Sequence, residues 1–479
     1  MKSIDNQLQL YGNYTDDNVF EERLWKSAEK LRGNIDSSQY KYILLGIVFL
    51  KFISISNINE FKNGHLYWSK IISSINKNSL ISEIQKIYKQ LEIDNKILEG
   101  ISLTFFPDIN IDSNRLSNII EIIDSINIDN ERYRDIFGKI YEYFLLNFSI
   151  NDAKRSGEYY TPQCVVKLLV KMLCPSNGKV YDPCCGTGGM FIQSDYINKQ
   201  NTKSELKFYG QEFNANTRRL ALINLLIHNI KGNLGNQSAD TFFEDLHHNL
   251  KANYILSNPP FNQKEWTDDR LLNYKKWPFG VPPQNNANYA WIQHIINHLS
   301  DSGIAGFILS NGSLSGISKD ELTIRKNIIE NDLIDCIVSL PSHLFYSTQI
   351  PVSLWIINKK KCNPNKVLFI NAYKNGSMLD KTHKILVDNE IETISNYYLS
   401  WNDGKTYNDI SGIVKSVDIE EIRKHKYALV PGRYVGFQKY HQDKFNFGNN
   451  ELQIIEDLLK NINKNSTLAV RVIKELING

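Results

Sequence analysis

The chain has 479 residues and a net charge of +3. That length leaves room for roughly two or three domains, each with a core of its own. The near-neutral balance excludes a strongly basic polyanion-binding protein, so contact with nucleic acid would need a local basic face or charge supplied by a partner.

Six cysteines without a C-x-x-C pair argue against a zinc site, and we expect no bound metal. No N-terminal signal segment is evident, which favours the reducing cytoplasm. The apolar run over residues 43–55 is too short for a membrane span and contains Lys51. It predicts a buried helix and no membrane contact.

The N-terminal third has helical periodicity, with amphipathic runs at 21–31, 119–126 and 135–148. It predicts an all-helical N-terminal domain over residues 1–150. The segment Glu158-Tyr159-Tyr160-Thr161-Pro162-Gln163 then precedes the helical spacing of residues 165–170. Thr161 suits the N-cap and Pro162 the first helical position, so this segment by itself predicts a helix start.

From residue 160 onward, strand-like runs alternate with helical ones. The strand-like runs are 179–182, 206–210, 253–257, 304–310, 333–340, 352–358 and 367–370. This alternation predicts an α/β fold over residues 151–436, with a mostly parallel sheet that helices cover on both faces.

A glycine-rich turn follows the first of these strands. Asp182 ends the strand, and Gly186-Thr187-Gly188-Gly189 leads into a helical run. Glycines permit positive φ and let backbone N–H groups approach a ligand at a helix N-terminus. The spacing is not G-x-G-x-x-G, and the Asp182 carboxylate would repel a pyrophosphate but suit a cation. S-adenosylmethionine, with its ammonium and sulfonium, fits this turn. Cys184 and Cys185 are interpreted as small residues of the turn, because no histidine motif pairs with them.

Glu212 ends the next predicted strand. It follows Gly189 at close to the ~20-residue spacing at which an acid of a Rossmann-type fold accepts hydrogen bonds from ribose hydroxyls. The turn, Asp182 and Glu212 together predict a cofactor site.

Asn258-Pro259-Pro260-Phe261 follows the run 253–257. The carboxyl ends of strands are where open α/β sheets bind ligands. An exocyclic base amine is a poor nucleophile because its lone pair is conjugated with the ring, so it needs acceptors that draw it toward tetrahedral geometry. The Asn258 oxygen and a neighbouring carbonyl can supply them, the prolines fix the chain, and Phe261 offers a face for stacking. Alone, the motif also fits a strand that ends in a proline turn.

Residues 264–286 interrupt the alternation with aromatic, charged and proline-rich sequence. We expect a loop over the cleft. Trp266, Trp277 and Phe279 either stack on an extruded base and its neighbours or pack the loop onto its own domain.

The order Y-T-P, D-P-x-x-G-T-G-G and N-P-P-F resembles the amino-methyltransferases that act on DNA adenine. More closely, the chain resembles the modification subunit of type I restriction-modification systems. The likeness continues through the segments 24–35, 288–291, 311–316, 340–341, 344–346 and 431–435, and so covers nearly the whole chain.

The resemblance implies a Rossmann-like S-adenosylmethionine-dependent methyltransferase sheet. It implies that Asn258, Pro259, Pro260 and Phe261 form the catalytic and base-holding motif. The implied cofactor-binding residues are Glu158, Tyr159, Tyr160, Thr161, Pro162, Gln163, Asp182, Gly186, Thr187, Gly188, Gly189, Glu212 and Asp240. The resemblance also implies adenine and not cytosine as the target base, because N-P-P-F is commoner in enzymes that act on adenine and S-P-P in those that act on cytosine.

The last segment, residues 437–479, carries the helical stripe Leu452, Ile455, Leu459 and Ile462. In the resembled family this region meets a separate specificity subunit, so the stripe is a candidate docking element; a helix folded back on the catalytic domain is the alternative. The resemblance implies double-stranded DNA as substrate and two copies of this chain around one specificity subunit. It leaves open whether a restriction nuclease subunit accompanies them.

Three other functions use similar motifs. A stand-alone adenine methyltransferase would need its own sequence-reading domain, for which we find no large segment. The helical N-terminal region and the Y-T-P segment count against a glutamine or RNA methyltransferase. A non-catalytic cofactor-binding scaffold would predict decay of a motif, and all three motifs are intact.

Overall fold

The computed structural model describes residues 18–33, 37–56, 61, 63–106, 112–126, 133–153, 161–201, 204–268, 271, 277–346, 348–380, 382–404 and 406–436. All of these belong to one compact unit, residues 1–436, and a second unit comprises residues 437–479. The predicted stripe from Leu452 to Ile462 therefore lies outside the described residues, as do Glu158, Tyr159 and Tyr160.

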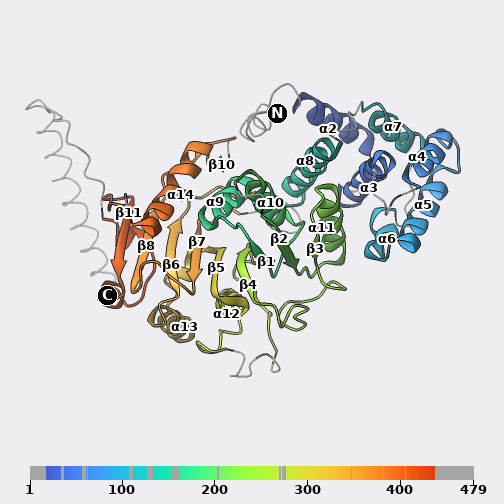
Figure 1. The fold of residues 1–479 in the computed structure, drawn as a ribbon. Helices are drawn as coiled ribbons and strands as arrows, with labels where there is room; N and C mark the ends of the chain where they lie inside the picture. Colours follow the sequence, from blue (N-terminus) through green and yellow to red (C-terminus); the bar gives the residue numbers. More distant parts are fainter. Residues whose placement is uncertain are drawn as a thin grey trace, which may run out of the picture. The chain divides into compact units, whose positions relative to one another are not determined.

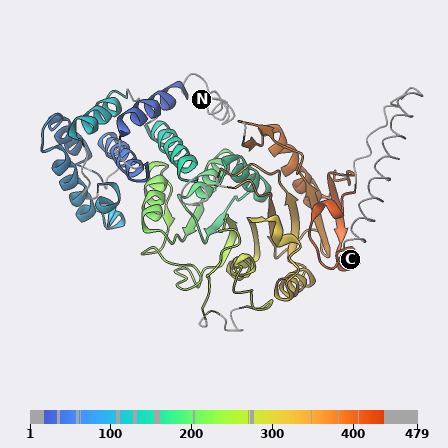
Figure 2. The same cartoon turned by 180° about the vertical axis from the view of Figure 1, so that it is seen from behind.

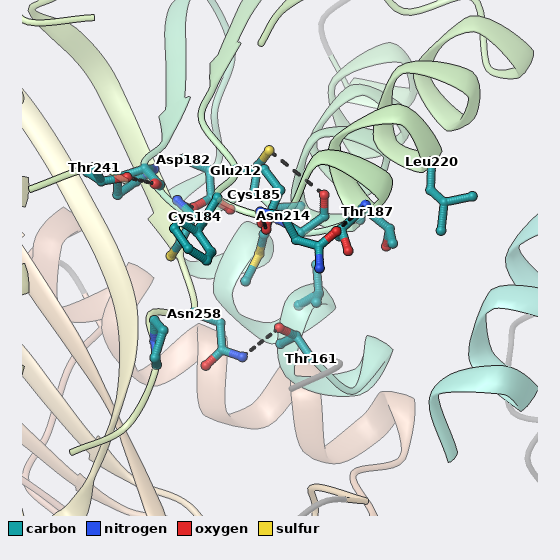
Figure 3. A pocket seen from close by; sticks show the side chains of 18 of the residues that line it. Thr161, Asp182, Cys184, Cys185, Thr187, Glu212, Asn214, Leu220, Thr241 and Asn258 are labelled. Carbon is teal, nitrogen blue, oxygen red and sulfur yellow. Dashed lines mark hydrogen bonds between the residues drawn. The ribbon is translucent and has the colours of Figure 1, made fainter. Parts of the chain in front are cut away.

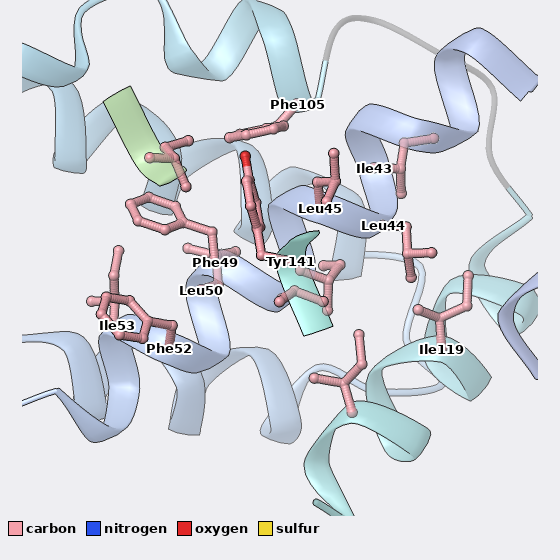
Figure 4. Packing of buried hydrophobic residues seen from close by; sticks show 14 of the residues in the cluster. Ile43, Leu44, Leu45, Phe49, Leu50, Phe52, Ile53, Phe105, Ile119 and Tyr141 are labelled. Carbon is pink, nitrogen blue, oxygen red and sulfur yellow. The ribbon is translucent and has the colours of Figure 1, made fainter. Parts of the chain in front are cut away.

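The N-terminal region is helical, as predicted (Figure 1). Its helices are α2 (Asn18–Arg32), α3 (Ser37–Ile55), α4 (Gly64–Ser73), α5 (Leu80–Asp94), α6 (Ile101–Phe105), α7 (Ser113–Asp124) and α8 (Tyr133–Ala153), with the 3-10 turn η2 (Lys96–Leu98). α3 contains the run 43–55, in which nearly all side chains are apolar and buried, as expected of a helix at the centre of a bundle. Figure 4 shows its side chains packed among Phe105 of α6, Ile119 of α7 and Tyr141 of α8.

The helical region shares its core with the sheet region through α11 (Ala215–Ile227). Leu220, Ile223 and Ile227 of α11 belong to the helical core, whereas its Ala221 and Leu225 belong to the core under the sheet. The Thr104 hydroxyl also donates to the side-chain oxygen of Asn216 over 2.9 Å. A domain boundary near residue 150 therefore stays a prediction.

The second region contains a nine-stranded sheet in the order β11-β8-β6-β7-β5-β4-β1-β2-β3. Its strands are β1 (Gly178–Asp182), β2 (Leu206–Gly210), β3 (Gly232–Asn233), β4 (Ala252–Ser257), β5 (Leu299–Ser310), β6 (Ile334–Ser339), β7 (Val352–Asn358), β8 (Lys366–Asn371) and β11 (Val414–Asp418). β7 runs antiparallel to both neighbours and β11 is antiparallel to β8; the other pairs are parallel. A small separate sheet joins β9 (Ser377–Met378) to β10 (Lys384–Ile385).

Helices cover both faces of the sheet (Figures 1 and 2). One core includes side chains of α9 (Gln163–Leu173), α10 (Gly189–Asn201) and α14 (Asp388–Asp403). The opposite core includes α12 (Asn288–His298), α13 (Lys319–Glu330) and α15 (Ile419–Lys424). Neighbouring strand residues alternate between them, since Val180 faces the first core and Tyr181 the second. Two 3-10 turns, η4 (Asn311–Leu314) and η5 (Pro431–Arg433), complete the chain described.

This fold confirms the predicted α/β class with a helical N-terminal region. The seven predicted strands are present; the short β3 and the edge strand β11 were not predicted. Among the described residues, no helix combines the length and apolar character that a membrane span needs.

Candidate active site

A cavity of about 650 Å³ opens where β1, β2 and β4 end (Figure 3). It receives side chains from the turn after β1, from the start of α11 and from the loop after β4. Residues of the predicted site that line it are Thr161, Gln163, Asp182, Gly186, Thr187, Gly189, Glu212, Asp240, Asn258 and Pro260. The structure thus brings together three motifs that lie far apart in the sequence.

Asp182 is buried at the end of β1, with 2% of its surface exposed. Its Oδ1 accepts a 2.7 Å hydrogen bond from the Ser257 hydroxyl and a 3.1 Å bond from the Cys184 N–H. Burial raises the pKa of Asp182 to about 7, and the charge of Glu212 adds to this, while the bonds from Ser257 and Cys184 oppose it. A cation in the cavity would therefore find a carboxyl group ready to ionise beside it.

Glu212 follows β2 and holds the glycine turn in place. Its two carboxylate oxygens accept from the N–H groups of Gly186 over 3.0 Å and Asn214 over 2.8 Å. Gly186 and Gly188 have φ values of +54° and +83°, which explains why glycine is needed there. A Cβ on Gly186 or Gly189 would meet no atom within 4 Å, so the turn borders open space where a ligand can approach its backbone.

Asn258 lies directly after β4. Among the described residues, the nitrogen of its side-chain amide has a hydrogen-bond partner and the oxygen has none. Its Nδ2 donates to the Thr161 hydroxyl oxygen over 2.8 Å (Figure 3). Its Oδ1 is buried and has no hydrogen-bond partner among the described residues. A buried amide oxygen without a donor costs about 1–3 kcal/mol, so this atom is poised to accept a hydrogen bond from a ligand.

Thr161 corrects one detail of the sequence analysis. α9 begins at Gln163, and Pro162 occupies the N-cap position, with its carbonyl accepting from Val165 and Val166. Thr161 is therefore not the N-cap. Its hydroxyl is left to orient Asn258, which ties the Y-T-P segment to the N-P-P-F motif.

Four predicted site residues do not line the cavity: Pro162, Gly188, Pro259 and Phe261. Phe261 is 8% exposed and packs edge-on against Phe345, with ring centroids 5.6 Å apart. The expected stacking face is thus turned into the core. Glu158, Tyr159 and Tyr160 lie outside the described residues.

Trp266, Trp277 and Phe279 of the loop 264–286 pack onto their own domain. Trp266 and Trp277 are each 1% exposed, and their indole N–H groups donate to the carbonyls of Pro283 and Leu271. Phe279 packs against the core on the α12 side of the sheet. Of the two interpretations of this loop, packing is the one observed.

Several lining residues were missed by sequence reasoning, among them Phe213, Asn214, Thr217, Phe242 and Gln263. Phe213 is 73% exposed although it follows Glu212 directly. A large aromatic residue next to a predicted ribose-binding acid was the available signal. Phe242 carried no such signal, because it belongs to a loop without a motif.

The charged and polar side chains that line the cavity fit S-adenosylmethionine. The described lining residues with carboxyl groups are Glu142, Asp182, Glu212, Asp240 and Glu265, against one with a basic group, Lys41. An acidic wall beside an open glycine turn suits a cationic nucleoside and would repel a phosphate. Burial also raises the pKa of the Cys184 and Cys185 thiols, which argues against a thiolate nucleophile.

Comparisons with known proteins agree with this geometry. The N-6 DNA Methylase family model matches residues 132–443, and the HsdM N-terminal domain model matches residues 20–64. The type I restriction enzyme HindI methylase subunit of Haemophilus influenzae is 36% identical over 404 residues, which covers 82% of this chain and 91% of the relative. The MjaIX methylase subunit of Methanocaldococcus jannaschii is 33% identical and covers 96% and 91%.

Among solved structures, the methyltransferase subunit of a type I restriction-modification system from Streptococcus thermophilus superposes with a TM-score of 0.74 at 24% identity, over 88% of this chain and 100% of that chain. A modification subunit of a putative type I restriction enzyme from Vibrio vulnificus gives 0.62 at 18% identity, over 84% and 93%. These two structures show a shared fold.

Proposed function

The chain belongs to the N-6 DNA methylase family, as a methylase subunit of the type I restriction-enzyme class, and from this premise we propose which of its residues perform the reaction. The enzyme is an adenine-specific DNA methyltransferase with S-adenosylmethionine as its methyl donor. When bound, the donor supplies a sulfonium methyl group that an amine nitrogen attacks directly. The chain's own task is to position both partners and to stabilise the charge that develops on the amine.

The observation that carries the proposal is the buried Oδ1 of Asn258, which has no hydrogen-bond partner in the part of the chain that the structure describes. The adenine N6 amine has two N–H groups and needs acceptors that pull it out of conjugation. Asn258 supplies one acceptor, and Thr161 fixes its direction by accepting from Nδ2. The backbone carbonyl of Pro259 or Pro260 supplies the second, held by rings that fix φ.

We propose that Asp182 and Glu212 hold the cofactor. Asp182 faces its cationic end, and Glu212, whose carboxylate oxygens also accept from the Gly186 and Asn214 N–H groups, accepts from its ribose hydroxyls. Asp240 lines the same cavity farther along the loop after β3. These assignments keep the roles expected from the motifs.

The target adenine must leave the duplex to reach Asn258. Pro260 lines the cavity, whereas the Phe261 ring packs against Phe345, so stacking on Phe261 would require that ring to turn out of the core. We propose that Pro260 forms the floor under the base in the conformation described.

A pair of variants tests these roles. Asn258→Ala should lower the rate of methyl transfer by about a hundredfold or more while the affinity for S-adenosylmethionine, measured by calorimetry, is retained. Glu212→Ala should weaken cofactor binding instead. Asn253→Ala, at the other end of β4, serves as the control and should keep both properties. Methyl transfer at the wild-type rate by Asn258→Ala would remove Asn258 from the mechanism.

We also propose that the chain works with a separate specificity subunit, as two copies per complex on double-stranded DNA, in the cytoplasm where host DNA is protected. Two observations support this. The relatives are methylase subunits by name. Within the described residues, the helical region and the catalytic sheet account for the fold, and no further module that could read bases is present there. A stand-alone adenine methyltransferase is the alternative.

A further inference from the structure

A second cluster of polar side chains lies against β1 on the α12 side of the sheet. His294 and His298 are one helical turn apart on α12, and Asp245 belongs to the loop between β3 and β4. The nitrogen and carboxylate oxygen atoms of the three that can bind a metal all lie within 4.8 Å of one another. His294 and His298 are 6% and 5% exposed. The expectation of no bound metal rested on cysteine spacing, and this cluster contains no cysteine.

Both ring nitrogens of His298 face oxygen atoms that can accept hydrogen bonds. Its Nδ1 lies 3.1 Å from the Leu250 carbonyl oxygen, and its Nε2 lies 2.9 Å from Oδ2 of Asp245. Both neighbours accept hydrogen bonds, but a neutral imidazole has one N–H. If Nδ1 donates to Leu250, the lone pair of Nε2 faces a carboxylate oxygen. A cation that bridges these two atoms would suit this arrangement.

The third donor favours a metal ion over a proton. A proton would satisfy His298 and Asp245 alone, yet the ring of His294 stands beside them, with the two imidazole centroids 4.4 Å apart and the ring planes at 37°. Two histidines at i and i+4 on one helix face are a recurring zinc-binding pair. A metal-bound histidine usually donates its other N–H to a carbonyl or carboxylate, as His298 can to Leu250.

We propose that Asp245, His294 and His298 form a structural site for a divalent transition metal ion, with zinc as the best match for two imidazoles and one carboxylate. Ligands at ~2.0–2.2 Å from a tetrahedral zinc lie about 3.4 Å apart, so the carboxylate has to move back by about half an ångström to admit the ion. Water or the Tyr181 hydroxyl, which is 3.3 Å from Nε2 of His294, is available for the fourth position.

The site would fasten a loop that builds the cofactor cavity. Asp240, Thr241 and Phe242 line that cavity and belong to the same loop as Asp245. The Phe242 ring packs on Trp291 of α12 with centroids 4.3 Å apart. A metal ion joining Asp245 to α12 would hold this loop at a second point. The ion takes no part in methyl transfer, and the proposal is independent of the catalytic roles given above.

Zinc binding to the tag-free, full-length protein tests the proposal directly. The protein is stripped with a chelator and titrated with zinc chloride by calorimetry, and its metal content is measured after dialysis by mass spectrometry. We expect about one zinc ion per chain and a higher melting temperature with zinc. His294→Gln should weaken zinc binding by at least about tenfold, since it removes a ligand that a shared proton would not need.

A matched control and a second readout keep the test decisive. His248→Gln changes an exposed histidine three residues from Asp245 and should leave zinc binding unchanged. Cobalt substitution of the wild-type protein should give visible absorption bands, which do not depend on whether a variant folds. A wild-type chain that takes up no stoichiometric zinc, or zinc uptake that is unchanged in His294→Gln, would overturn the site.

Discussion

Single residues of the cavity determine how it responds to pH. Because burial raises the pKa of Asp182 to about 7, this carboxyl group is partly protonated near neutral pH when the cavity holds no cation. A cationic ligand favours the ionised form, so binding below pH 7 must expel a proton. Cofactor affinity should therefore increase as the pH rises from 6 to 8, by at most about tenfold per pH unit.

Calorimetry of S-adenosylmethionine binding across this pH range checks the prediction. The amino group of the free cofactor titrates near pH ~8 whichever protein is studied, so the comparison must be with Asp182→Asn. The variant should bind more weakly and lose most of the increase between pH 6 and 7. An identical pH profile in both proteins would show that Asp182 does not face the cation.

The loop that carries Asn258 is held by Asn262 and Asn288. Asn262 has a φ of +51°, and its N–H donates to Oδ1 of Asn288 over 3.0 Å while Nδ2 of Asn288 donates back over 2.9 Å. Asn288→Ala removes both bonds. We expect the rate of methyl transfer to fall about tenfold with unchanged cofactor affinity, because a misplaced acceptor affects the transition state and not cofactor binding.

Steady-state kinetics separates positioning from a general loss of structure. A positioning role for Asn288 predicts a lower kcat per correctly folded molecule, with the melting temperature as the control for folding. A change confined to the KM for S-adenosylmethionine would contradict this role.

The motifs predicted the site residues at strand ends well and the loop aromatics poorly. Asp182 ends β1, Glu212 lies shortly after β2 and Asn258 directly follows β4. The carboxyl ends of these parallel strands meet at one edge of the sheet, so the meeting of the three residues could be predicted. Phe261 turns away because Phe345, distant in the sequence, offers it an apolar partner. The direction in which an aromatic side chain of a loop packs depends on such a distant partner. The local sequence does not reveal that partner.

At the scale of elements, α3 carries Lys51 within its apolar run 43–55. Lys51 donates to Oδ1 of Asp124 in α7 over 2.7 Å, and Trp68 Nε1 donates to the same oxygen over 2.8 Å. The Lys51 side chain is 11% exposed, whereas that of Asp124 is 42% exposed. Despite burial, these two hydrogen bonds lower the pKa of Asp124.

The unequal exposure predicts unequal costs of removing each partner. Asp124→Ala leaves a nearly buried ammonium unpaired and should destabilise the protein by about 2–4 kcal/mol. Lys51→Met leaves a carboxylate that water can reach and fills the same space, so it should cost less than about 1 kcal/mol. Chemical denaturation of both variants measures the difference. Equal losses would mean that the ion pair itself, and not desolvation of Lys51, sets the cost.

The strands were predictable from their apolar runs, but their directions were not. β7 is antiparallel to β5 and β6, although its sequence Val352–Asn358 is as uniformly buried as that of a central parallel strand. Burial on both faces gives the same continuous apolar pattern in either direction. β3 has only two residues, and buried and exposed side chains alternate only weakly along β11. Neither strand therefore has a sequence pattern from which it could be predicted.

At the scale of the whole molecule, the C-terminal segment is the predicted docking element. The stripe Leu452, Ile455, Leu459 and Ile462 lies outside the described residues, so its role stays a prediction. Truncation after Gly448 should weaken co-purification with the specificity subunit while S-adenosylmethionine binding to the chain persists. A truncated chain that retains the partner fully would place the docking surface elsewhere.

Methylation mapping tests the central claim most directly. Genomic DNA is treated with S-adenosylmethionine and either the chain alone, the chain co-purified with its specificity subunit, or that complex carrying Asn258→Ala, and every modified base is located by sequencing. We predict N6-methyladenine at one defined motif with the complex, little sequence-specific methylation with the chain alone, and none with the variant. Complete methylation of a defined motif by the chain alone, or N4-methylcytosine as the product, would contradict the account.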